Sequence, residues 1–202
     1  VGFINLEEYH PEKAQFNQVS QITDLLYPTK KKLAAIVEVG YDYPISSFPE
    51  RSEKTIDLVR VIMWKRMLKE GKEYCIELIK KGYEVCIQAT RTEQYSDEEF
   101  ADLIKSFNEI NPRGIYIVDT FGLLTKDVLL KYARIADMHL KEGIALGYHA
   151  HNNLQQAFSN TVALTEENWN HELMIDASVY GMGRGAGNLN LELYMTYLNN
   201  KY

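Results

Sequence analysis

The chain has 202 residues, of which 46% are hydrophobic and 25% charged, values that are ordinary for a globular protein with one core. The net charge of −6 gives no support to a nucleic-acid or anionic-membrane partner. We expect neither a membrane span nor a signal peptide, because no stretch has the required apolar length. The two cysteines, Cys75 and Cys86, have no metal-type neighbours at close spacing, which indicates reduced thiols in a cytoplasmic protein.

The chain opens on Val1-Gly2-Phe3-Ile4, which is typical of the end of a strand whose beginning is missing, so we interpret the sequence as a piece of a longer protein. Residues 41–49 are loop-like, with two prolines. Short apolar runs predict buried strands at 33–39, 58–64, 83–89, 115–119, 143–148 and 172–179. Helical spacing of apolar residues predicts helices at 67–81, from 96 until Asn111 breaks the pattern, and at 125–141, 154–164 and 189–198.

Three helix ends carry recognisable capping residues. Ser96 is followed three residues later by Glu99, which predicts a capping box. Thr125 is expected to cap the helix at 125–141, and Gly82 is expected to end the helix at 67–81.

Strands and helices alternate at roughly 30 residues per unit, which favours parallel strands joined by crossover helices. The predicted fold class is therefore α/β, a (β/α)8 TIM barrel of one domain over residues 1–202 that is incomplete at the amino terminus, where the first unit is missing. A doubly wound open sheet is the alternative. It would need a glycine-rich turn after the first strand, whereas the glycine-rich turn here follows the last.

Two histidines, His149 and His151, stand at the end of one predicted strand. Side chains two apart share a face of a strand and lie roughly 7 Å apart at the backbone, which two imidazoles can close onto one metal ion. A neutral imidazole pair suits zinc, manganese or iron, and added oxygen ligands shift the preference toward manganese or magnesium. The alternative is two histidines bonded to nearby backbone or carboxylate groups.

Other candidate side chains follow neighbouring strands. Asp119 ends one predicted strand, and Thr120 follows it. In one interpretation their carboxylate and hydroxyl groups face a pocket. In the other, Asp119 is a helix cap or turn residue. Asp176 and Ser178 share a face of the last strand, where packing or support of the site is as good an interpretation.

Glycine occupies every second position of residues 181–187 and precedes a predicted helix. Backbone N–H groups there could hold an anion, with Arg184 adding charge. Asn188 ends this run, and its spacing alone favours a helix N-cap.

These segments carry a resemblance. Residues 117–122, then 147–154, then 175–178 with 181–188 resemble, in order and spacing, the metal-dependent TIM-barrel lyases, and most of all their aldolase branch. That superfamily includes 4-hydroxy-2-oxovalerate aldolase, hydroxymethylglutaryl-CoA lyase and isopropylmalate synthase. The resemblance covers roughly residues 33–200.

The resemblance implies that His149 and His151 are paired metal ligands and that Asn188 ligates or adjoins the metal. Thr120 matches a hydroxyl residue that contacts the carboxylate of a 2-keto acid, and Asp119 would support the rim and the bound substrate. A divalent metal is implied, with manganese expected and magnesium, zinc or cobalt as alternatives. The implied partners are a 2-keto acid and an aldehyde, and a homo-oligomer is compatible with the pattern.

One departure from the family is large. The family has an Arg-Asp-Gly motif on its first strand, whose Asp is a metal ligand and whose Arg stabilises the enolate. Arg51, Arg60 and Arg91 are not followed by Asp-Gly. Because residues 1–3 match the end of the family's second strand, we expect the motif upstream of Val1. No residue of this sequence can be named as the general base.

The leading functional hypothesis is a metal-dependent aldolase, a carbon–carbon lyase that acts through a metal-stabilised, pyruvate-type enolate. One alternative is a Claisen-type acyl-CoA synthase on the same scaffold. Another is a non-catalytic barrel that retains the metal pair.

Overall fold

The computed structural model describes residues 2–7, 9, 10, 12, 14–26, 30–40 and 43–201. Val1 of the expected first strand lies outside these residues, as do Tyr41 and Asp42 of the expected loop. The chain divides into two compact units, residues 1–89 and 90–202. A single domain over residues 1–202 stays a prediction.

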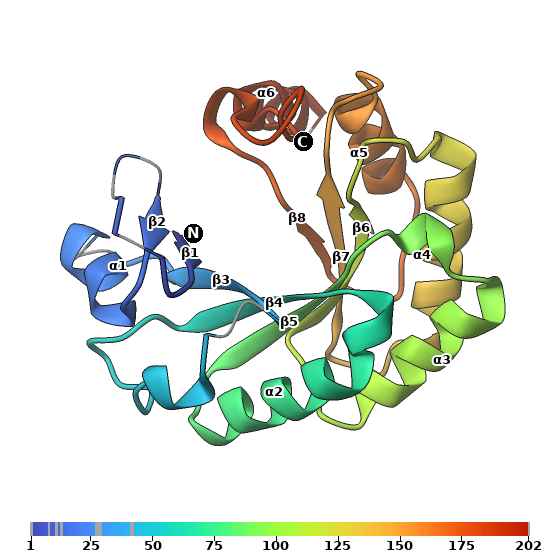
Figure 1. Ribbon diagram of the computed structural model, residues 1–202. Coiled ribbons are helices and arrows are strands. Elements are labelled where there is room, and N and C mark those ends of the chain that lie inside the picture. Colours follow the sequence, from blue (N-terminus) through green and yellow to red (C-terminus); the bar gives the residue numbers. More distant parts are fainter. Residues whose placement is uncertain are drawn as a thin grey trace. The chain divides into compact units, whose positions relative to one another are not determined.

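The unit of residues 1–89 is built on parallel strands that are hydrogen-bonded in the order β2-β1-β3-β4-β5. Helix α2 covers one face of β4 and β5 (Figure 1). The elements are β1 (Gly2–Ile4), β2 (Gln15–Phe16), α1 (Val19–Leu26), β3 (Ala34–Glu38), β4 (Leu58–Met63), α2 (Leu68–Lys80) and β5 (Glu84–Ala89), with short 3-10 helices η2 (Ile45–Ser47) and η3 (Lys65–Met67).

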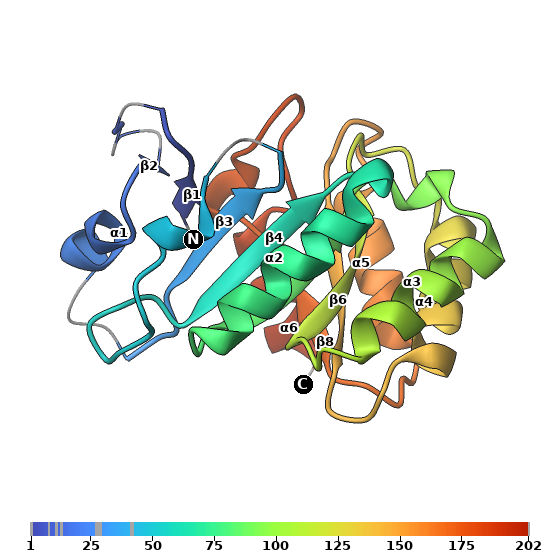
Figure 2. The same ribbon diagram turned by 60° about the horizontal axis from the view of Figure 1, so that its bottom comes forward.

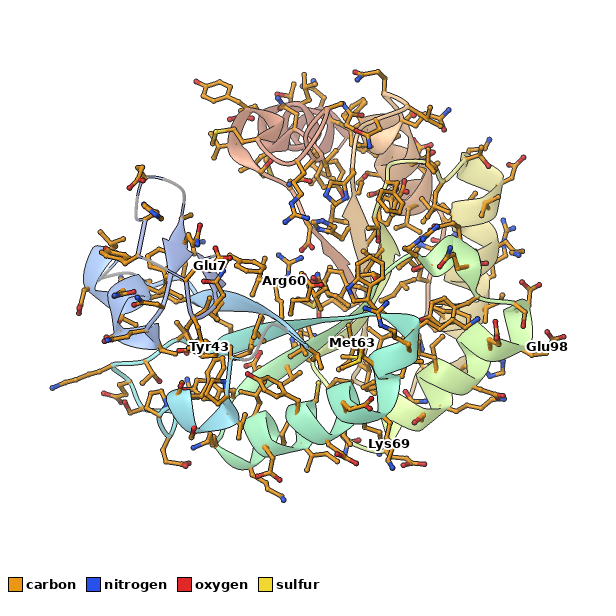
Figure 3. All side chains as sticks on the ribbon, viewed as in Figure 1. Glu7, Tyr43, Arg60, Met63, Lys69 and Glu98 are labelled. Atoms are coloured by element: carbon orange, nitrogen blue, oxygen red, sulfur yellow. The ribbon has the colours of Figure 1, made fainter. Side chains whose placement is uncertain are left out.

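Strand alternation decides which side chains of β4 meet α2. Arg60 and Met63 point to opposite faces of the strand (Figure 3). A Cβ placed on Gly71 would lie 2.6 Å from the Met63 sulfur, so the helix can approach the strand only because residue 71 has no side chain. Met63 is fully buried by this contact.

The unit of residues 90–202 contains β6 (Gly114–Asp119), β7 (Ala145–Ala150) and β8 (Leu173–Ile175), which are parallel and paired in that order. Helices α3, α4 and α5 lie one beside the next along these strands (Figures 1 and 2). The remaining elements are η4 (Thr92–Gln94), α3 (Asp97–Asn108), α4 (Lys126–His139), α5 (Ala157–Glu166), η5 (Val179–Gly181) and α6 (Leu191–Lys201).

The core of this unit contains several large aromatic side chains. Tyr116, Tyr148, Phe100 and Phe107 are almost fully buried. A Cβ on Gly147 of β7 would lie 2.2 Å from the Tyr116 ring, so the ring fills the space that a side chain would need. Tight packing therefore fixes β6 against β7 in the middle of both strands, where Tyr116 and Gly147 are paired.

Most predicted elements are confirmed to within one or two residues at each end. The capping box is also confirmed. The Glu99 N–H donates to the Ser96 hydroxyl over 3.2 Å, and the Ser96 N–H donates to the Glu99 carboxylate over 2.8 Å. Gly82 has the expected positive φ of +89° just after α2.

Several element ends were predicted wrongly. Helix α5 begins at Ala157, not at residue 154, because Gln155 has a φ of +57° that a helix cannot contain. Strand β8 ends at Ile175, not at residue 179, and α6 begins at Leu191, not at residue 189. The reason is that the backbone of Ser178 pairs with Leu189 and Asn190 instead of continuing β8.

Two further expectations need correction. Thr125 stands at the N-cap position of α4, but its side chain makes no capping hydrogen bond within the described part of the chain. Residues 45–47 of the expected loop form the 3-10 helix η2. Helix α1 and strand β2 had no counterpart in the sequence-based prediction.

Cys75 and Cys86 are both buried, and neither forms a disulfide within the described residues. Burial raises the pKa of the Cys75 thiol well above its ordinary value. Across the described ranges, no helix has the length and apolar character that crossing a membrane requires.

Candidate metal centre

The carboxyl ends of β6 and β7 bring the predicted residues side by side. The strands are in register, with Val118 opposite His149 and Asp119 opposite Ala150. His151 follows directly and forms an isolated antiparallel bridge with Asn188. The two histidine rings are 4.9 Å apart between centroids and stand at 79° to each other.

The His149 ring is oriented by a carboxylate. Its Nδ1 lies 2.8 Å from Oδ2 of Asp176, which comes one residue after β8, and the two side chains are only 19% and 16% exposed. A neutral His149 would carry its proton on Nδ1 to make this bond, so a metal would be bound through Nε2. The interpretation of Asp176 as a supporting residue agrees with this position.

The His151 ring is oriented by the main chain. Its Nδ1 lies 3.0 Å from the carbonyl oxygen of Asp119. A carbonyl oxygen only accepts, so Nδ1 carries the proton and donates it. Nε2 of a neutral His151 is then the nitrogen with the lone pair. Both histidines therefore present the same ring atom for coordination.

Asn188 is not the helix N-cap that its spacing favoured. The cap is Asn190, whose Oδ1 accepts the Leu193 N–H over 2.9 Å. The Asn188 amide nitrogen donates to the Met182 carbonyl over 3.1 Å. Its Oδ1 is buried and has no hydrogen-bond partner among the described residues. A buried, unpartnered carbonyl oxygen is costly unless something else binds it.

A metal ion fits these three residues. Two imidazoles and an amide oxygen are a donor set for a divalent ion of intermediate hardness. Within the part of the chain that the structure describes, no three His, Cys, Asp or Glu side chains gather as a metal-binding group.

The Asp119 carboxylate bonds to the backbone of the turn that follows β6. It accepts the backbone N–H groups of Leu123 and Leu124 at 2.8 and 3.2 Å, and the residue is 2% exposed. Burial raises the pKa of Asp119, and the two N–H groups oppose that rise. This geometry matches the turn role. A direct contact of Asp119 with substrate stays a prediction.

Thr120 reaches a neighbouring loop. Its hydroxyl oxygen accepts the Arg91 N–H over 2.8 Å, and Arg91 adopts a φ of +56°. An accepting hydroxyl keeps its own proton to donate. The Arg91 guanidinium lies over the Phe121 ring, 5.1 Å from its centroid, and pairs with Glu93.

A sequence model of the HMGL-like family matches residues 12–201. The chain belongs to the HMGL-like family.

Among curated relatives of this HMGL-like chain, an oxaloacetate decarboxylase from Mycobacterium tuberculosis is 28% identical over 121 residues, which are 60% of this chain and 34% of the relative. A 4-hydroxy-2-oxovalerate aldolase from Bacillus thuringiensis is 30% identical over 118 residues, which are 58% of this chain and 33% of the relative.

The matched segments span about a third of these relatives' length. Among solved structures, the HMG-CoA lyase of Bacillus subtilis is similar to 99% of this chain and 74% of its own, with a TM-score of 0.70 and 15% identity. That likeness shows the fold, and it confirms the α/β TIM-barrel class that the sequence predicted.

Sequence reasoning missed two residues that bond to the glycine loop, residues 181–188, or to its start. The Glu192 carboxylate accepts the Tyr180 N–H just before the loop. Ser178, which the sequence analysis named as a possible support, donates its hydroxyl to the Met182 carbonyl. Asn153 bonds to this loop as well. The Asn pair beside His151 was a signal that could have pointed to Asn153, whereas nothing in the spacing pointed to Glu192.

Proposed function

We propose that this HMGL-like chain carries the metal-binding half of a divalent-metal-dependent lyase or aldolase that makes or breaks a carbon–carbon bond beside a 2-oxo acid. The observation that carries the proposal is the buried, unpartnered Oδ1 of Asn188, a residue that pairs with His151 in a β-bridge, together with the anchoring of both histidines through Nδ1. An anchored histidine pair beside an oxygen that needs a partner is the arrangement that a metal ligand set requires.

In this proposal His149, His151 and Asn188 hold the ion. Manganese is the expected metal, with magnesium, zinc and cobalt as alternatives, because the donors mix imidazole nitrogen with amide oxygen. When bound, the ion supplies Lewis-acid stabilisation of the negative charge that a 2-oxo acid develops as the carbon–carbon bond changes.

Thr120 orients the substrate. Its hydroxyl oxygen is held by the Arg91 N–H, so its proton can point at a substrate carboxylate. Asp119 keeps the turn after β6 in shape, and through its carbonyl oxygen it also sets the His151 ring. A fixed turn and a fixed ring together place substrate and metal ligands at one edge of the strands.

The names of the relatives support the substrate class. One relative is named for oxaloacetate and another for 4-hydroxy-2-oxovalerate, and both compounds are 2-oxo acids. We propose a 2-oxo acid of the pyruvate type, with an aldehyde as the second reactant. The cytoplasmic location and a homo-oligomer stay predictions.

Metal titration tests the proposal. We expect the wild-type chain to bind Mn²⁺ and the His149→Ala/His151→Ala variant to lose binding, because both imidazole ligands are gone. His171→Ala is the matched control, since His171 precedes β8 and bonds through Nδ1 to the Ile144 carbonyl, at the opposite end of the strands. Unchanged Mn²⁺ binding in the double variant contradicts the metal centre.

A turnover assay separates the three functional hypotheses. Aldehyde formation or consumption with a 2-oxo acid and Mn²⁺ supports the aldolase. Thiol release from acetyl-CoA would favour the acyl-CoA synthase, and metal binding without turnover on a panel of 2-oxo acids would favour the non-catalytic barrel.

A further inference from the structure

The side chain of Asn153 joins two loops that meet beside His151. Its amide nitrogen donates to the carbonyl oxygen of Phe121 over 2.7 Å, in the turn after β6. Its amide oxygen accepts the N–H of Ala186 over 3.1 Å, in the glycine loop. One exposed side chain thus uses both ends of its amide to tie two segments that lie 65 residues apart, since 186 − 121 = 65.

Backbone bonds on either side fix where Asn153 stands. The Leu154 N–H donates to the Gly122 carbonyl over 3.2 Å, and the Asn152 N–H donates to the Gly187 carbonyl over 2.8 Å. The first bond reaches the turn after β6, and the second reaches the glycine loop. Asn153 therefore lies between two loops that its neighbours already hold in register.

The glycines of both loops leave room for residue 153. A Cβ on Gly185 would lie 2.8 Å from the Asn153 amide oxygen, and Gly185 has a φ of +61°. A Cβ on Gly122 would lie 2.6 Å from the Asn153 backbone nitrogen, and Gly122 has a φ of +63°. Both loops thus lack a side chain where they approach Asn153, as a close contact requires.

We propose that Asn153 is a positioning residue of the metal centre, whose amide holds the glycine loop against the turn after β6 and so keeps Asn188 beside His151. The inference rests on the proposed function, in which Asn188 is a metal ligand. Asn153 acts through the loop and is not itself a ligand.

The physical reason lies in the freedom of the loop. Glycine-rich backbone has many conformations to lose, and only those that place the Asn188 oxygen beside the histidines can bind the ion with all three ligands. The apparent affinity falls in proportion to the population of the competent arrangement. A side chain that raises this population raises the affinity without touching the metal.

The test compares Asn153→Ala with Asn152→Ala. Asn153→Ala removes both amide bonds. Asn152→Ala is the matched control. The Asn152 amide oxygen accepts the Ala157 N–H at the start of α5 over 3.1 Å, and within the described residues its side chain makes no hydrogen bond to the glycine loop. Thermal unfolding of both variants establishes that each folds.

The first readout is trypsin cleavage after Arg184, an exposed residue of the glycine loop, followed by mass spectrometry of the metal-free chain. Cleavage tracks the population of the opened loop. We expect Asn153→Ala to be cut faster there than the wild type, and Asn152→Ala to be cut at the wild-type rate. Asn153→Asp keeps the acceptor for Ala186 but lacks the donor to Phe121, so its rate should be intermediate.

The second readout is Mn²⁺ affinity by calorimetric titration. We expect Asn153→Ala to bind Mn²⁺ about 10-fold more weakly or worse, with Asn152→Ala equal to the wild type. If the wild type binds Mn²⁺ and Asn153→Ala binds it with the same affinity, the inference about Asn153 is overturned and the proposed function is not. A wild type that binds no Mn²⁺ contradicts the proposed function, and the positioning role is then lost with it. Faster cleavage with unchanged affinity would limit Asn153 to holding the loop and also overturns the inference.

Discussion

The bond between His149 and Asp176 gives the sharpest quantitative prediction. The Asp176 carboxylate accepts from His149 Nδ1 over 2.8 Å, and both side chains are mostly shielded from water. Replacing such an outer partner of a metal-binding histidine lowers metal affinity by about 10- to 100-fold, or about 1.4–2.8 kcal/mol. Asp176→Ala removes the acceptor and should lie near the upper figure.

Asp176→Asn separates charge from geometry. Asparagine keeps an oxygen that can accept the Nδ1 proton, so the ring orientation is retained while the negative charge is lost. We expect a loss of affinity near 10-fold, at about the lower figure of the range. Calorimetric titration with Mn²⁺ measures both variants against the wild type.

Asp137→Ala is the matched control for a lost carboxylate. Asp137 lies on α4 and bonds to the backbone and side chain of Asn170, away from the histidines. This variant should bind Mn²⁺ as the wild type does. Should Asp176→Ala bind Mn²⁺ with wild-type affinity while folding normally, the assignment of Asp176 as the support of His149 is refuted.

Three further predictions concern stability and reactivity. Ser96→Ala should lower the free energy of unfolding by about 0.5–2 kcal/mol, and Thr125→Ala by less, because of the two side chains only Ser96 makes a capping bond in the described residues. Urea unfolding measures both variants, and equal losses would contradict the assignment of Ser96 as the cap. Gly147→Ala should cost about 1–3 kcal/mol, because the new Cβ meets the Tyr116 ring; a wild-type melting curve would be incompatible with that contact. The Cys75 thiol should resist a thiol reagent at pH 8 until the protein unfolds, because burial raises its pKa and excludes the reagent; rapid labelling of the folded chain would refute this.

The strands were predictable because each is a short apolar run between polar or glycine-containing segments. The same rule located the histidine pair. The period of two along a strand placed His149 and His151 on one face, and the structure brings their rings within 4.9 Å between centroids. Ser96 and Glu99 were equally accessible, since a capping box is a local pattern.

What the sequence could not supply were contacts between loops. Whether Asn188 or Asn190 caps α6 depends on the pairing of Ser178 with the segment before that helix, which no local pattern encodes. Helix α5 begins later than predicted because Gln155 has a positive φ, and a glutamine in the sequence gives no indication of that conformation. Helix α1 is short, and it lies before the regular alternation of strands and helices begins.

The hydrogen-bond acceptors that orient the two histidines differ in how a substitution affects them. His149 is oriented by a side chain, so a single codon change at position 176 can alter the electron donation of its imidazole to an ion. His151 is oriented by a main-chain carbonyl, which every amino acid at position 119 would still provide. A point mutation at position 176 can therefore change the hydrogen bond that orients His149. The hydrogen bond that orients His151 is retained whichever amino acid occupies position 119.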